Sequence, residues 1–143
     1  MPEWIIQIND ILTRLNLIST AFRILLAMVC GGVIGLERAN FIGGSMGASV
    51  VMLTGQYMYE TFQAGDPARL GAQVISGIGF LGAGSIIIAG GKRVKGLTTA
   101  AGLWVAGCIG LTIGIGFYAA AVLMTGAVFL VMSKLRLVEE HIV

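Results

Sequence analysis

Long apolar segments separated by short charged ones dominate the chain. Residues 15–36 contain one charge, Arg23, and residues 39–59, 70–91 and 96–133 contain none. Because a helix needs roughly 20 apolar residues to cross a bilayer, each of the first three segments fits one span, and the last folds into two spans that turn near residues 114–118. The pattern predicts an all-α membrane protein, a bundle of about five transmembrane helices in a single domain over residues 1–143. The expected spans cover approximately residues 18–36, 41–59, 70–89, 97–114 and 117–133.

The residues before the first span predict an amphipathic segment that lies at the membrane interface. On a helix, apolar side chains share one face and polar ones point to water. Trp4 serves as the interfacial anchor. The apolar face comprises Trp4, Ile5, Ile11, Leu12 and Leu15, and the polar face Gln7, Asp10 and Arg14.

Composition agrees with lipid as the solvent. The chain is 57% hydrophobic and 11% charged, against about a quarter charged in soluble domains, and a soluble domain of this size could not bury so much apolar surface. The net charge of +2 is too small for a nucleic-acid footprint. Cys30 and Cys108 lie in apolar stretches and are interpreted as small buried hydrophobes. The sequence contains no Ser/His/Asp arrangement, phosphate loop or metal-ligand cluster, so we expect neither an enzyme nor a cofactor.

Basic residues predict the orientation of the chain. With five spans, one side of the membrane carries six of them: Arg38, Lys92, Arg93, Lys95, Lys134 and Arg136. The opposite side holds Arg14 and Arg69, and Arg23 is expected to snorkel outward from a position close to that boundary. The positive-inside rule then places the N-terminus outside and the C-terminus in the cytoplasm of a bacterial inner membrane.

Glycines predict close packing of helices. Pairs of small residues four positions apart let helix backbones approach, and the third span is so rich in glycine that we expect it in the middle of the bundle. Residues 77–82 match the dinucleotide pattern G-x-G-x-x-G, but the pattern lies inside a span with no preceding strand, so it is interpreted as packing. The glycine pairs are Gly31/Gly35, Gly43/Gly47 and Gly110/Gly114, and the third span adds Gly71, Gly77, Gly79, Gly82 and Gly84.

A few polar residues are candidates for the interior of the bundle. Asp66 and Pro67 form a typical helix start, with Asp66 as N-cap. Gln73 lies one turn beyond Arg69 on the same face and needs a hydrogen bond between helices. Thr98 is expected to cap the fourth span. The pair Glu37-Arg38 has two readings that remain open: interfacial anchors, or a buried ion pair that lines a polar site.

Three segments resemble the MgtC/SapB family of bacterial inner-membrane proteins: residues 31–38, 66–84 and 94–104. They span most of the chain from Ala27 to Ala121. Two departures limit what is carried over. Family members have a basic stretch directly after the Glu-Arg pair, whereas here Asn40 leads straight into the second span. The virulence-linked members also have a soluble C-terminal domain, whereas this sequence supplies only the transmembrane part, up to Val143.

The resemblance implies a multi-pass protein needed under magnesium limitation or for survival inside host cells. The family name suggests magnesium transport, yet the virulence-linked members resemble regulators that restrain the proton-driven ATP synthase. Mg²⁺ prefers carboxylate ligands, and no Asp or Glu lies inside any predicted span, which weakens the transport reading. The leading hypothesis is a non-enzymatic modulator of a membrane partner, with the ATP synthase as one candidate and a homodimer as another. The alternative is a Mg²⁺ or other cation transporter or channel. The candidate residues are Glu37, Arg38, Asp66, Arg69, Gln73, Ser76 and Thr98.

Overall fold

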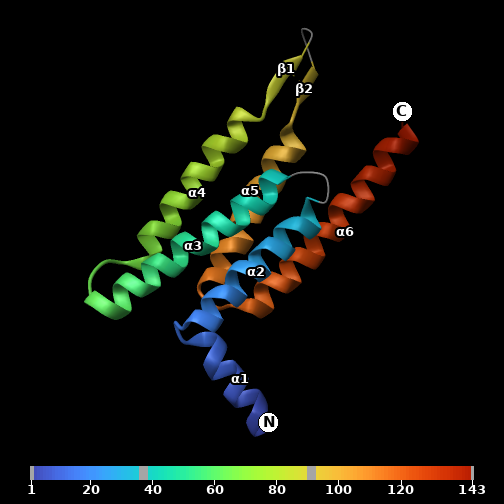
Figure 1. Ribbon diagram of the computed structural model, residues 1–143. Helices are drawn as coiled ribbons and strands as arrows, with labels where there is room; N and C mark the ends of the chain where they lie inside the picture. Colours follow the sequence, from blue (N-terminus) through green and yellow to red (C-terminus); the bar gives the residue numbers. More distant parts are fainter. Residues whose placement is uncertain (1, 36–38, 90–92, 143) are drawn as a thin grey trace.

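A computed structural model describes residues 2–35, 39–89 and 93–142. This part of the chain forms six helices and one two-stranded hairpin (Figure 1). The all-α prediction is confirmed, because helices α2 to α6 overlap the five predicted ranges and α1 occupies the predicted amphipathic segment. The elements are α1 Glu3–Thr13, α2 Leu17–Ile34, α3 Ala39–Phe62, α4 Pro67–Gly84, β1 Ile87–Ala89, β2 Arg93–Lys95, α5 Leu97–Gly114 and α6 Tyr118–Ile142.

Helices α2 to α6 run up and down in an elongated bundle. The start of α2, the α3–α4 connection and the α5–α6 turn lie at one end, which we call the α1 end, and the hairpin and the C-terminus lie at the other (Figure 1). Helix α5 is central and contacts α2, α3, α4 and α6. Helix α4 forms one edge of the bundle and packs on α3 and α5, while α6 lies at the opposite edge against α2 and α5.

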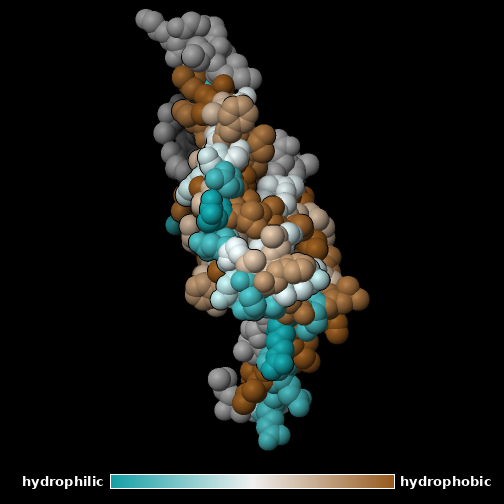
Figure 2. All heavy atoms as spheres, turned by 90° about the vertical axis from the view of Figure 1, so that its left-hand side faces the viewer, coloured by the Kyte–Doolittle hydropathy of each residue, from teal (hydrophilic) through white to brown (hydrophobic). Residues whose placement is uncertain are grey.

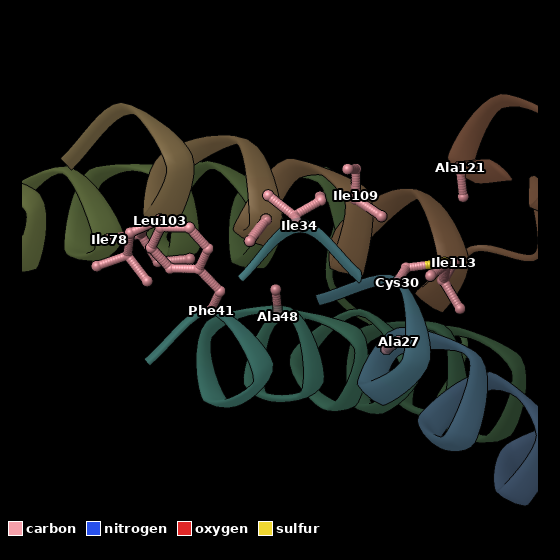
Figure 3. Close-up of a cluster of buried hydrophobic side chains, with 11 residues drawn as sticks. Ala27, Cys30, Ile34, Phe41, Ala48, Ile78, Leu103, Ile109, Ile113 and Ala121 are labelled. Atoms are coloured by element: carbon pink, nitrogen blue, oxygen red, sulfur yellow. The ribbon is translucent and has the colours of Figure 1, made fainter. Parts of the chain in front are cut away.

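The core forms where small and branched side chains of α2 to α6 meet (Figure 3). Phe41 is its largest apolar member and is 1% exposed. Its ring lies over the glycine surfaces of Gly35 and Gly102. Helices α2 and α5 therefore approach the start of α3 closely enough that neither position accepts a larger residue. The cluster comprises Ala27, Cys30, Ile34, Phe41, Ala48, Ile78, Leu103, Ala106, Ile109, Ile113 and Ala121.

Glycines let the central helices touch through their backbones. A side chain at Gly110 of α5 would meet the backbone of Ser45 in α3, and one at Gly114 would meet Met52 and the carbonyl oxygen of Ser49. A side chain at Gly31 of α2 would lie 2.8 Å from the carbonyl oxygen of Phe41. The predicted packing role is confirmed for these positions, for Gly35 against Phe41 and for Gly82 against Ala100.

Other predicted packing glycines do not contact a neighbouring helix. Within the described part of the chain, a side chain would meet nothing within 4 Å at Gly43, Gly47, Gly77, Gly79 or Gly84. The prediction that the third span lies in the middle of the bundle is wrong for the single chain. Helix α4 has neighbours on one side only, so it buries one face, with Gly71, Ile78 and Gly82.

The third predicted span also ends too late. Helix α4 stops at Gly84, and Ile87–Ala89 pairs antiparallel with Arg93–Lys95. The β-branched run at residues 86–88 favours an extended backbone over a helix. Gly96 follows the hairpin with φ +94° and serves as the N-cap of α5. A side chain there would collide with the carbonyl oxygen of Ser85, so the connection depends on glycine.

Two of the described helices are long and apolar enough to cross a membrane by length and composition. They are α2, over Leu17–Ile34, and α5, over Leu97–Gly114, and Tyr118–Lys134 of α6 forms a shorter apolar helix. Large apolar side chains also cover the outside of the bundle, including Leu17 and Phe80, which are 85% and 79% exposed. This surface suits lipid better than water.

The glycine crossing of α3 and α5 yields a stability prediction. Gly110→Ala places a methyl group against the backbone of α3, which cannot yield as a flexible side chain would, and should lower the free energy of unfolding by about 1–3 kcal/mol. Gly126→Ala on α6 is the control, because its side chain would meet nothing within 4 Å. SDS titration of the purified protein, followed by circular dichroism, measures both. Equal stability of the two variants would contradict the crossing.

Candidate functional site

The most unusual side chain of the bundle is Arg23 of α2, which is completely buried. Taking a charged side chain out of water costs several kcal/mol unless hydrogen bonds replace its hydration. An arginine at such a position therefore needs acceptors fixed around its planar guanidinium group. Arg23 lies near the α1 end of the bundle, where α1, α3, α5 and α6 supply them.

The guanidinium group of Arg23 donates hydrogen bonds to four different acceptors. Its Nε donates to the Tyr118 hydroxyl at 3.0 Å. Its Nη1 donates to Gln56 Oε1 at 2.9 Å and to the carbonyl oxygen of Gly114 at 2.7 Å. Its Nη2 donates to the carbonyl oxygen of Leu12 at 3.1 Å. One side chain thereby joins α2 to four other helices.

Two of these acceptors are backbone carbonyls at helix ends. Gly114 is the last residue of α5, and Leu12 lies in the last turn of α1. The final four carbonyls of a helix have no amide partner within it, and they carry the negative end of the helix dipole. A buried cation at this point therefore donates to two helix-end carbonyls and is itself stabilised by two helix dipoles.

The Leu12 carbonyl oxygen is a shared acceptor. The Tyr118 hydroxyl donates to it at 2.6 Å, and the Ser19 hydroxyl donates at 2.7 Å. The Tyr118 ring also packs edge-on against Phe22, with 5.3 Å between ring centroids. The start of α6 is thus fixed both through its hydroxyl group and through its ring. We call Leu12, Ser19, Arg23, Gln56, Gly114 and Tyr118 the arginine cluster.

The arginine cluster reaches the surface through Gln56. The amide oxygen of Gln56 accepts from Arg23, while its Nε2 donates to Glu60 Oε1 at 2.8 Å. Glu60 is exposed. The Gln56 amide therefore links the buried guanidinium group to a carboxylate at the α1 end of the bundle, and both of its polar atoms form hydrogen bonds.

The expectation that Arg23 snorkels outward is wrong. A snorkelling arginine needs an open path to water, but the α5–α6 turn and the end of α1 close over this position. A signal was present in the sequence: Arg23 lies six residues after the first residue of α2, and Gln56 lies six residues before the last residue of α3, so both lie at the same depth from the α1 end. Polar residues inside membrane helices usually face one another, and that rule would have joined them.

The predicted polar residues of α4 lie elsewhere. Asp66 is confirmed as N-cap, since its side chain accepts from the Ala68 amide at 2.9 Å. Arg69, Gln73 and Ser76 are exposed, so their predicted interior placement is wrong for the single chain. The buried face of α4 is the opposite one, which α3 and α5 cover.

Thr98, another candidate, lies at the hairpin end of the bundle (Figure 1). Thr98 is exposed, and its predicted capping role is wrong because Gly96 is the N-cap of α5. Glu37 and Arg38 lie outside the described residues, so their two readings stay open.

The arrangement is suited to holding helix ends together. Among the described residues, no three His, Cys, Asp or Glu side chains come together in a way that could hold a metal ion. The central group of the arginine cluster is a cation whose hydrogen-bond donors point at carbonyl and side-chain oxygens. Such a site fixes five helices relative to one another.

Arg23→Met tests whether the arginine cluster stabilises the bundle. The substitution removes the Arg23 donor from the Gly114 carbonyl oxygen and from Gln56 Oε1, and should lower the free energy of unfolding by about 3 kcal/mol or more. Arg23→Lys keeps the charge but not the planar fork, so we expect an intermediate loss. Arg14→Met is the control, because Arg14 is 76% exposed and forms only a surface ion pair with Asp10 at 3.0 Å. Its loss should stay below about 1 kcal/mol. If Arg14→Met and Arg23→Met lower the free energy of unfolding by similar amounts in an SDS titration, the arginine cluster does not stabilise the bundle.

Comparison with known proteins identifies the family. Residues 24–141 match the MgtC family. An uncharacterised protein of Haemophilus influenzae is 38% identical over 135 residues, covering 84% of this chain and 57% of that protein. MgtC of Salmonella typhimurium is 34% identical over 138 residues, covering 90% and 58%.

A third relative carries a transport name. YhiD of Escherichia coli K12, named as a candidate magnesium transporter, is 36% identical over 110 residues, covering 67% of this chain and 51% of that protein. The chain thus spans about half the length of the curated relatives it matches. No solved structure matches. The match covers most of the chain, including Arg23's neighbours Gln56, Gly114 and Tyr118, and this membrane protein belongs to the MgtC family.

Proposed function

We propose that this chain is a non-enzymatic, multi-pass inner-membrane protein that modulates another membrane protein when magnesium is limiting. The observation that carries the proposal is the arginine cluster, which joins five helices around a buried cation. A bundle fixed in this way is suited to presenting constant outer faces to a partner. Membership of the MgtC family links the protein to magnesium, and the proton-driven ATP synthase is the candidate partner that the resemblance implies.

The arginine cluster also argues against a cation path through the single bundle. A Mg²⁺ ion crossing it at the α1 end would meet the positive guanidinium group of Arg23, and fixed positive charge in a narrow passage is a barrier to cations. Besides Arg23, the described core offers apolar side chains and the buried hydroxyls of Ser19, Ser45, Ser49 and Thr125. Mg²⁺ instead prefers carboxylates and keeps several of its waters.

Cation transport is the second candidate function. Its support is the name of the E. coli relative YhiD. In this reading Glu37 and Asp66 are the carboxylates that ions would meet, and Asp66 is exposed at the α1 end of the bundle. Any path would then run along the outside of α4 or between copies, rather than through the arginine cluster.

One preparation tests both functions. The protein is reconstituted with purified ATP synthase in liposomes that hold a Mg²⁺-sensitive dye, and a parallel batch holds a pH-sensitive dye. We expect no protein-dependent Mg²⁺ entry, and a lower initial rate of ATP-driven proton pumping that saturates once every synthase is occupied. Gly126→Ala is the matched protein control, since it alters an exposed position without neighbours.

Each other outcome removes a defined part of the proposal. Mg²⁺ entry that falls on Glu37→Ala would establish the transporter instead. No Mg²⁺ entry together with unchanged proton pumping would exclude the ATP synthase as partner.

The proposed orientation places the C-terminus in the cytoplasm. The up-and-down order of the helices supports it, because the hairpin with Arg93 and Lys95 lies at the same end as the C-terminus (Figure 1). Basic residues then concentrate on the cytoplasmic side. A reporter fused after Val143 should be active only if it functions in the cytoplasm, and an export-dependent phosphatase fused there should be inactive. Activity from the phosphatase alone would reverse the orientation.

A further inference from the structure

The two edges of the bundle differ in chemistry. The α6 edge exposes large apolar side chains, which suit lipid: Val122, Leu123, Met124, Leu130 and Val131. The α4 edge exposes the polar side chains of Arg69, Gln73 and Ser76, together with small residues and the apolar side chains of Ile75, Phe80 and Leu81. Figure 2 views this side of the molecule and shows hydrophilic surface running between apolar areas.

The polar residues of α4 form one stripe. Arg69, Gln73, Ser76 and Phe80 follow at spacings of four, three and four residues, which places them on a single helix face. We call these four residues the α4 stripe. It lies opposite the buried face of α4, and all four side chains are exposed. Small exposed residues flank it: Ala72, Gly77, Gly79, Ala83 and Gly84.

The polar part of this face, formed by Arg69, Gln73 and Ser76, is poorly suited to lipid. Within the described part of the chain, the Gln73 amide makes no side-chain hydrogen bond, although it lies two turns inside α4. An unpaired amide in hydrocarbon costs free energy, so polar groups in membrane helices usually meet a partner. A side chain placed at Gly77, Gly79 or Gly84 would meet no other described residue within 4 Å. Glycine lowers helix stability relative to alanine, and its usual benefit is the close approach of another backbone.

We propose that the α4 stripe is the interface between two copies of this chain. An amide carries both a donor and an acceptor. Across a twofold axis, Gln73 of one copy can therefore form hydrogen bonds with Gln73 of the other. Copies inserted in the same orientation bring their α4 helices together in parallel. Asp66 and Arg69 are opposite charges one turn apart, so each copy can pair its Arg69 with the partner's Asp66. Phe80 meets the open glycine surfaces of the partner's α4.

The symmetry of these residues selects a second copy over another partner. A different protein would have to supply an amide, a carboxylate and a glycine surface at matching positions along a helix, whereas an identical chain has all three. The described helices of the same chain do not cover this face, because α6 lies at the opposite edge. The inference does not depend on the proposed function: a modulator and a transporter can both be dimers.

Disulfide trapping in native membranes tests the interface. The native thiols, Cys30 and Cys108, are first changed to alanine. Ser76→Cys then probes the α4 stripe, and Ala127→Cys on α6 is the control. Both positions are exposed, and each lies nine residues after the first residue of its helix, Pro67 or Tyr118. Copper-phenanthroline oxidation should convert Ser76→Cys, but not Ala127→Cys, to a species of twice 14.9 kDa.

A second pair of variants measures the contribution of the amide. Adding Gln73→Leu to Ser76→Cys should lower the association constant by about threefold to tenfold, the range for interhelical hydrogen bonds in membranes. Adding Gln7→Leu, on exposed α1, should leave it unchanged. The association constant is read from energy transfer between labelled copies as lipid is added.

The remaining outcomes reject the proposal. Equal trapping at both cysteines would indicate random collision, and no trapping at either would indicate a monomer. Trapping of Ser76→Cys in a species other than twice the chain mass would assign the α4 stripe to a different protein. If Ser76→Cys is fully trapped but the addition of Gln73→Leu leaves the energy transfer unchanged, the paired amides are not the source of association.

Discussion

The bundle depends on the hydrogen bonds that Arg23 donates inside it. A guanidinium group removed from water must find acceptors, and here oxygens from α1, α3, α5 and α6 accept hydrogen bonds from it. Lipid makes this requirement strict, because no water is available to replace a missing acceptor. Helices that share only apolar contacts can slide against one another, whereas these are held in one register at the α1 end.

Glycine contacts between α5 and α3 add to the stabilisation that the arginine cluster provides. Gly114 takes part in both: its carbonyl oxygen accepts from Arg23, and its missing side chain lets α5 approach Ser49 and Met52 of α3. Farther along the same crossing, Gly110 allows contact with the backbone of Ser45. Close approach and a directed polar contact therefore reinforce each other over one stretch of α5. The same geometry encloses the hydroxyls of Ser45 and Ser49, which have no hydrogen-bond partner in the described part of the chain.

Much of the fold could be predicted from the sequence, because charge marks the ends of membrane helices. The breaks at Asp66–Pro67 and at residues 114–118 lie where predicted, since capping and turn chemistry are local. The hairpin after Gly84 was missed because its first strand, Ile87–Ala89, is as apolar as a span. The site was harder: whether Gln73 or Arg23 faces inward depends on which neighbours surround each helix. That is a property of the whole bundle, and a single helix pattern does not contain it.

The arginine cluster also constrains the order in which the protein can be completed. Two acceptors of Arg23, Gly114 and Tyr118, lie 91 and 95 residues further along the chain. At roughly 5–20 residues per second, the ribosome supplies them about 5 to 20 s after Arg23 emerges. During this interval the arginine has only Leu12 and Gln56 among these four acceptors. A chain cut short before α5 ends would carry into the bilayer a guanidinium group that lacks the Gly114 and Tyr118 acceptors.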